Sequence, residues 1–307
     1  MSSHDTGVLS FSSKKSSSSS FVVALLERSG PVVVAEHDVY LFRSGSDKWE
    51  VFKKVYVHGA NDGSDLLWWS TDAVVPYRRR FLMWVDYYRG MIVADMSSES
   101  SGKKLPAPPK LCYVPLPVDT LPVHPSGDCG RGCPEASRCV CATRPGIKFV
   151  SVDHQETSSF GLGRMRTWTS TFRITTWSFC DDDYTWRKEA TMDPDELWAA
   201  LDDSEHRFPH VPQDFPVVNM ENPDAVCFLL DKSRHTRCGS EPTWMIEVDM
   251  KKKVLLGRTV YPGGSGSPED QGAIKTAIGG AHQHQTFVST EIPRYMCGGK
   301  ACKKRRQ

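Results

Sequence analysis

The chain has 307 residues, 38 of them basic and 37 acidic, with a formal net charge of +1. Proteins that bind nucleic acid or membrane surfaces through their overall charge carry a basic excess, so this balance argues against both classes of partner. The apolar fraction of 39% supports a hydrophobic core, and no apolar run reaches the roughly 18 residues of a membrane helix. We expect a cytoplasmic or nuclear protein without a membrane or nucleic-acid partner.

The two ends of the chain are polar. Residues 1–20 are rich in serine and lack the apolar core of a secretory signal, so they predict a disordered tail. Residues 293–307 end in KKRRQ, a basic tail compatible with nuclear import. The sequence therefore predicts one β domain over residues 21–292.

Short segments rich in β-branched and aromatic residues, bounded by turn residues, predict strands throughout this domain. In chain order they are FVVALLE, PVVVAEHDVYLFR, RRFLMWVDYY, GMIVADM, LCYVPLPV, RCVCATRPGIKFVSVD, RTWTSTFRITTWSF, DAVCFLL and PTWMIEVDM. A single segment, MDPDELWAALDD, predicts a helix, with Asp193 as its cap and Pro194 at its first position.

A weak internal repeat suggests how these strands are organised. VYLFRSGSDKWEVFKKV and FRITTWSFCDDDYTWRKEATM each read as a strand, a polar turn, a tryptophan and a second strand. WVDYYRGMIVADM and WMIEVDMKKKVLL share a plan of two apolar strands around a polar turn. Repeated short strands of this kind favour propeller-like or sandwich packing, and we predict mainly β, propeller-like antiparallel sheets with one short helix, in an arrangement that could be incomplete.

The hairpin from Trp84 to Met96 carries two aspartates, Asp86 and Asp95. If Arg89 and Gly90 form a two-residue turn, the two aspartates become diagonal neighbours on one face, roughly 7–8 Å apart. Glycosidase carboxylates have similar separations. The alternative is a structural role, in which each aspartate accepts hydrogen bonds from the backbone or from nearby arginines, and this second interpretation is favoured.

Four cysteines, Cys129, Cys133, Cys139 and Cys141, lie within thirteen residues. Four thiolates can form a tetrahedral zinc site, but the C-x3-C and C-x-C spacings depart from the two-residue gap of zinc ribbons. Cys139 and Cys141 also fit a strand that faces the core. Ordinary reduced thiols are favoured over zinc, and no cofactor is predicted.

Trp68 and Trp69 are adjacent. Neighbouring residues of a strand point to opposite faces, so one of these two rings is expected to be exposed. An exposed tryptophan is a typical anchor for a protein partner, and both residues are candidate partner-binding residues.

Several blocks together resemble a known family. WVDYYRGMIVADM, LCYVPLPV, GIKFVSVD, TTWSF with WRKEATMDPDELW, and FPVVNMENPDAVCFLL follow one another over about residues 81–250. Their order is similar to that of the plant family called domain of unknown function 1618. The resemblance implies no established catalytic activity and no agreed active-site motif. It also implies a strand plan like that of the propeller-like domains associated with F-box proteins, which bind protein partners, although no F-box-like helical segment is expected here.

We therefore predict an interaction module that is not an enzyme and binds an unidentified protein partner. The alternative is a carbohydrate-active or other hydrolase that uses Asp86 and Asp95.

Overall fold

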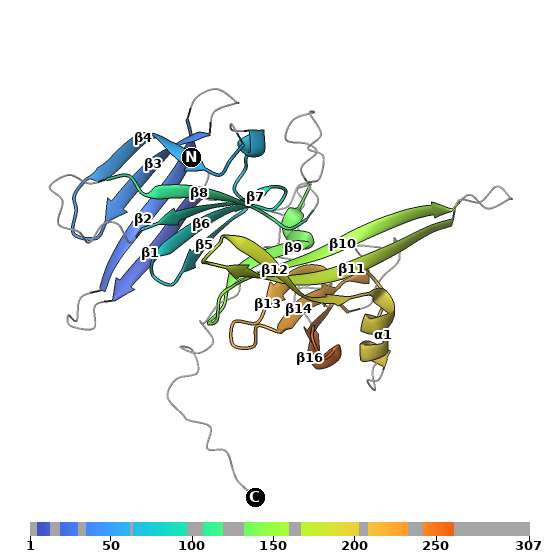
Figure 1. Cartoon of the computed structure of the whole chain (residues 1–307). Helices are drawn as coiled ribbons and strands as arrows, with labels where there is room; N and C mark the ends of the chain where they lie inside the picture. Colours follow the sequence, from blue (N-terminus) through green and yellow to red (C-terminus); the bar gives the residue numbers. More distant parts are fainter. Residues whose placement is uncertain are drawn as a thin grey trace, which may run out of the picture.

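The computed structural model describes residues 5–12, 19–29, 35–61, 64–96, 107–118, 132–159, 167–202, 208–232 and 242–260 (Figure 1). Within these ranges the protein forms sixteen strands and one α-helix, which confirms the mainly β prediction. The strands group in chain order into four antiparallel meanders of four strands each, which we call the first to fourth sheets.

Each sheet contains four strands that are consecutive in the sequence. The first sheet contains β1 (Thr6–Ser12), β2 (Ser19–Arg28), β3 (Glu36–Arg43) and β4 (Trp49–His58). The second contains β5 (Ala73–Tyr77), β6 (Phe81–Asp86), β7 (Gly90–Asp95) and β8 (Lys110–Pro115). The third contains β9 (Arg138–Ala142), β10 (Ile147–Ser159), β11 (Thr167–Cys180) and β12 (Thr185–Met192). The fourth contains β13 (Asp214–Val218), β14 (Ala225–Leu230), β15 (Trp244–Asp249) and β16 (Val254–Val260).

The first and second sheets are joined by a short parallel pairing of β4 with β8, in which Val57 lies opposite Leu111 and His58 opposite Cys112. The resulting eight-stranded sheet is almost closed, because β1 and β5 at its two ends contact each other. Gly7 permits this contact, since a Cβ atom there would lie 2.6 Å from Val74 Cγ1. The two sheets consequently enclose an apolar core.

Each pair of consecutive sheets shares one hydrophobic core, which gives three cores within the described residues. The first includes Leu9, Ala24, Leu41, Trp84, Ile92 and Leu111. The second includes Met83, Val85, Met91, Phe149, Trp177 and Phe179. The third includes Val150, Ile174, Leu197, Phe228, Ile246 and Val248. Side chains that alternate along one strand enter different cores, because successive residues of a strand point to opposite faces.

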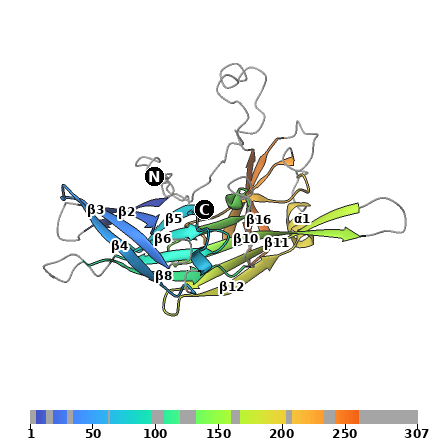
Figure 2. The same cartoon turned by 90° about the horizontal axis from the view of Figure 1, so that it is seen from above.

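The order of the sheets resembles a propeller. The first strands of the four meanders, β1, β5, β9 and β13, contact one another in sequence, as the inner strands of propeller blades do. The fourth strands of the first three sheets, β4, β8 and β12, lie along one side of the molecule (Figure 2). The arrangement is open, because the first sheet lies at one end of the described structure and the fourth lies below the third sheet, away from the first (Figure 1).

One of the two pairs of segments in the predicted internal repeat occupies equivalent positions in two sheets. VYLFRSGSDKWEVFKKV forms the third and fourth strands of the first sheet, and FRITTWSFCDDDYTWRKEATM forms the same strands of the third sheet. The second pair is out of register: one hairpin is β6–β7, the second and third strands of its sheet, whereas the other is β15–β16, the third and fourth.

The predicted helix is α1 (Pro194–Asp202), which follows the third sheet. Asp193 caps it as predicted, since the backbone N–H of Glu196 donates to Asp193 Oδ1 at 3.0 Å. The Glu196 carboxylate accepts in return from the Asp193 N–H at 3.1 Å, which completes a capping box. Leu197 and Leu201 are buried in the third core. No helix among the described residues has both the length and the apolar character needed to cross a membrane.

The prediction of a disordered tail over residues 1–20 is wrong for Thr6–Ser12, which form β1. One face of this stretch, with Gly7, Leu9 and Phe11, packs on the first core, whereas Val8 on the other face is exposed. Residues 293–307, the predicted basic tail, lie outside the described residues.

Gly90 begins β7 at a position with no room for a side chain. A Cβ atom there would lie 2.4 Å from the Val114 carbonyl oxygen and 2.7 Å from the Tyr113 ring. We predict that Gly90→Ala lowers the free energy of unfolding by about 1–3 kcal/mol, because the neighbouring strand must move. Urea denaturation measures the change. The control is Gly146→Ala, whose nearest neighbour is Tyr77 Oη at 3.8 Å; an equal loss in both variants would contradict the steric explanation.

His37 on β3 is 2% exposed, and neither of its ring nitrogens has a hydrogen-bond partner among the described residues. Burial and, to a smaller extent, the positive charge of Arg28 together lower the pKa of His37 to about 4, against the opposing effect of Asp38. His37 is therefore neutral in the folded protein at pH values where an unfolded histidine is already protonated.

We predict that His37 makes the protein less stable as the pH falls from about 6.5 to about 4, because the unfolded chain takes up the proton first. The total loss is about 3 kcal/mol. Chemical denaturation at a series of pH values should show that His37→Leu flattens this slope, whereas His58→Gln, at an exposed histidine, leaves it unchanged. An unaltered slope in His37→Leu would assign the pH dependence to other groups.

Candidate interaction surface

The register predicted for the Trp84–Met96 hairpin is wrong. Asp86 lies opposite Gly90 and Asp95 lies opposite Phe81, so Tyr87, Tyr88 and Arg89 form a three-residue turn. The Asp86 carbonyl accepts the Arg89 N–H at 3.0 Å and closes this turn. Asp86 and Asp95 are thus at opposite ends of the hairpin, about 17 Å apart along the strand, and on opposite faces.

Each aspartate has structural partners. Asp86 is fully buried, and its carboxylate accepts the backbone N–H groups of Ser70 at 3.0 Å and Tyr88 at 2.9 Å, with the Arg89 guanidinium 3.9 Å away. Asp95 pairs at the surface with Arg80, through two hydrogen bonds of 3.0 and 2.5 Å. These two carboxylates therefore cannot act on one bond, and the structural interpretation of the aspartates holds.

The cysteine cluster is only partly described, because Cys129 lies outside the described residues. Cys139 and Cys141 are buried in the third core, as the core alternative predicts. Cys133 lies apart from that core and donates to the Glu135 carboxylate at 3.4 Å. Within the described ranges, no three His, Cys, Asp or Glu side chains are arranged to hold a metal ion. A four-cysteine zinc site stays an untested prediction.

Trp68 and Trp69 follow a short 3-10 helix (Ser64–Leu66) and lie in a turn, not on a strand. The Trp68 side chain is 55% exposed, at a backbone φ of 60°. Trp69 packs against the first core and donates from Nε1 to Thr71 Oγ1 at 3.2 Å. One ring is thus exposed, as predicted; whether either binds a partner stays a prediction.

The strand register brings together a set of exposed and half-buried apolar side chains on the first sheet, on the face turned away from the first core. Paired residues of neighbouring strands share a face, and the register therefore forms a row of four side chains across the sheet. We call this surface the outer face. It consists of Val8, Val23, Phe42 and Trp49 in that row, with Phe21, Tyr40, Val51 and the buried Leu25 beside it.

Much of this outer face is open to solvent. Val8 is 54% exposed, Trp49 50%, Val51 48% and Phe21 40%. The Phe42 and Trp49 rings contact each other, with centroids 5.5 Å apart. Isolated exposed apolar residues are normal, but a contiguous group of this kind marks an interaction site. The sequence did contain a signal: β2 and β3 are apolar at successive positions, whereas a strand with one face in water should alternate with polar residues.

A charged network borders the outer face. Lys53 pairs with Asp38 at 2.5 Å, and Asp38 also accepts the Lys54 backbone N–H at 3.0 Å and the Ser29 hydroxyl. Burial of Asp38 opposes its ionisation, but these hydrogen bonds outweigh burial and lower the pKa of Asp38 to about 2. Lys53 and Asp38 neutralise each other, so this pair adds no net charge to the apolar surface.

The comparisons with known proteins identify a family for part of the chain. Residues 84–227 match the model of a family described as "Protein of unknown function (DUF1618)". This segment of the chain belongs to the DUF1618 family. No curated protein and no solved structure matches it. The DUF1618 match runs from β6 in the second sheet to β14 in the fourth, so the outer face lies on strands that precede the matched segment.

The different environments of the two aspartates lead to a prediction about stability. Asp86→Ala should lower the free energy of unfolding by about 3 kcal/mol, because it leaves buried N–H groups and the Arg89 charge without their acceptor. Asp95→Ala removes a surface ion pair and should cost about 1 kcal/mol or less. Thermal and urea unfolding of the two variants measures both values. Equal losses would contradict the structural roles assigned to these residues.

Proposed function

We propose that this DUF1618 protein is a non-enzymatic interaction module that binds a protein partner through the outer face of the first sheet. The observation that carries this proposal is the row of Val8, Val23, Phe42 and Trp49, continued by Val51, in which Val8, Trp49 and Val51 are exposed and Val23 and Phe42 half-buried. By contrast, the inner face of the first sheet and both faces of the second and third sheets are packed in hydrophobic cores. Covering a large apolar surface is the main favourable term in protein association.

The partner is expected to present a predominantly apolar surface without a net charge at the centre of the contact. The outer face offers aromatic and aliphatic side chains there, and its Lys53–Asp38 pair is already neutralised. Trp49 is the best candidate for the central anchor, because tryptophan contributes more than most residues at the centre of interfaces. Trp68 is a second candidate anchor. What speaks against the hydrolase alternative is the separation of Asp86 from Asp95.

The test is a binding measurement with a defined partner. A partner is captured with the tagged full-length chain, purified, and titrated by calorimetry against wild type and Trp49→Ser/Val51→Ser. We predict at least about tenfold weaker binding for the double variant, since one interface hot spot contributes about 2 kcal/mol or more.

The matched control is Val254→Ser/Leu256→Ser on β16, where the two side chains are 42% and 45% exposed. This variant loses similar exposed apolar side chains from the far end of the molecule and should bind within about twofold of wild type. Trp68→Ala tests the second anchor separately. Wild-type affinity in Trp49→Ser/Val51→Ser would refute the outer face as the binding surface.

A further inference from the structure

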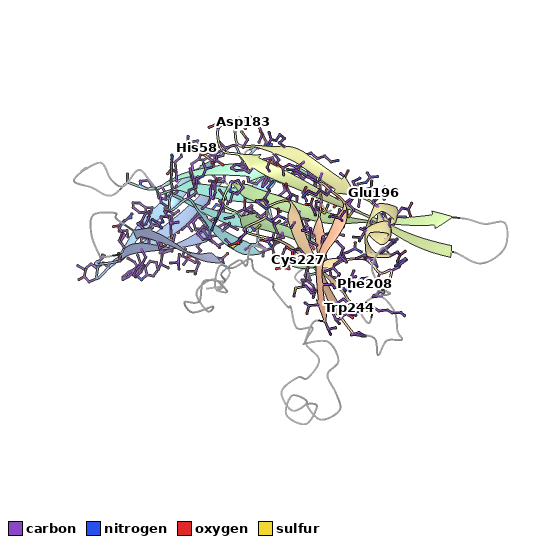
Figure 3. The ribbon with its side chains drawn as sticks, turned by 90° about the horizontal axis from the view of Figure 1, so that it is seen from below. His58, Asp183, Glu196, Phe208, Cys227 and Trp244 are labelled. Atoms are coloured by element: carbon purple, nitrogen blue, oxygen red, sulfur yellow. The ribbon has the colours of Figure 1, made fainter. Side chains whose placement is uncertain are left out.

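A groove of about 570 Å³ runs beside β4. One wall is the β4 stretch from Val51 to Tyr56, with His58 beyond it, and the other wall is Pro108–Lys110 at the start of β8. Figure 3 shows His58 at the rim of the molecule, well away from Trp244 and Phe208 of the opposite end. The groove is within the usual size range of binding clefts in proteins.

The groove adjoins an open strand edge. β4 pairs with β3 along most of its length, but on its other side it pairs with β8 only at Val57 and His58. From Trp49 to Tyr56, that side of β4 therefore has no neighbouring strand among the described residues. An exposed edge of this kind presents unpaired backbone N–H and C=O groups, to which an extended peptide can add as a further strand.

The charges around the groove have one sign. Its basic lining residues are Lys53, Lys54, His58 and Lys110, Tyr56 contributes a phenol, and no carboxylate of a described residue lines it. Asp38 neutralises Lys53, whereas neither Lys54 nor Lys110 forms an ion pair with a described residue. Asp95, which lies opposite Lys110 on β7, is held by Arg80. The groove thus has a local excess of positive charge on a chain that is nearly neutral overall.

A β-bulge sets the positions of these lysines. Lys53 and Lys54 together oppose the single residue Asp38, because the register shifts between His37 and Val39. Lys54 has a φ of 55°, and the Asp38 carboxylate accepts its N–H. Bulges and lysines on edge strands normally prevent association with an identical edge. A second copy of β4 would bring like charges together, whereas an acidic strand would not.

We propose that β4 binds an extended acidic segment of a partner protein, which adds as a fifth strand to the first sheet. Its backbone pairs with the edge between Trp49 and Phe52, its carboxylates face Lys54 and Lys110, and its apolar residues extend the outer face. This inference rests on the proposed function and specifies the chemistry of the partner. A nucleic acid is the less favoured occupant, since the wall of the groove is a strand edge that offers backbone pairing.

The test uses a fluorescein-labelled decapeptide of alternating valine and glutamate, titrated by anisotropy against the full-length chain. We expect saturable binding that weakens as the salt concentration rises, and protection of β4 amides from hydrogen exchange in the complex. Lys54→Glu/Lys110→Glu should weaken binding at least about tenfold. The control Lys188→Glu/Arg144→Glu makes the same change in net charge at two exposed residues outside the groove and should leave binding unchanged.

Two further probes separate strand addition from simple charge attraction. A decapeptide with the same charges but with every second amide N-methylated cannot pair along one edge, and it should bind at least about tenfold more weakly. A single-stranded oligonucleotide of equal charge should bind more weakly than the decapeptide. Equal binding of the methylated peptide, tighter binding of the oligonucleotide, or full binding by Lys54→Glu/Lys110→Glu would each overturn the proposal.

These outcomes are distinct from those that test the proposed function. If the purified partner binds through Trp49 and Val51 but the decapeptide does not bind, the strand-addition proposal is refuted and the outer face is supported as the binding surface. If the decapeptide binds at β4 but Trp49→Ser/Val51→Ser leaves partner binding unchanged, the outer face is refuted as the binding surface and the peptide-binding groove is supported.

Discussion

The structure depends on the burial of the second and third sheets on both of their faces. Along β6, Leu82 and Trp84 enter the first core, whereas Met83 and Val85 enter the second. A strand in this position must be apolar at successive residues, and its polar groups must find partners inside the protein. Asp86 meets this demand by accepting two backbone N–H groups beside Arg89. The segment that matches DUF1618 begins in this strand and includes most of the doubly buried region.

The first sheet is built in the same way, but the described residues cover it on one face only. Its inner face fills the first core, while its outer face carries Val8, Phe42 and Trp49 toward solvent. Apolar residues on both faces are needed in the middle of the stack, but at its end they leave an uncovered surface. This difference is the physical basis for proposing an interaction role: a surface suited to cover by another sheet lies at the end of the stack.

Asp38 affects both the charge of this surface and the backbone geometry of its edge. Its carboxylate accepts from Ser29, Lys53 and the Lys54 backbone, and so supports the bulge at which two residues of β4 face one residue of β3. The bulge interrupts the edge and places lysines beside it. Such an edge is unfavourable for a strand of its own composition and remains compatible with an acidic one, which gives the proposed contact its selectivity.

The sequence by itself determined the local features: the β content, the capped helix α1, most strands of the second to fourth sheets, and the resemblance to a family that the family model confirms. These depend on residue preferences within short segments. It missed β1, and it placed Asp86 and Asp95 on one face because it assumed a two-residue turn. One extra turn residue changes every pairing in a hairpin. Only the tertiary structure decided which apolar faces are covered, because burial depends on the sheet stacked against each face, and no single strand contains that information.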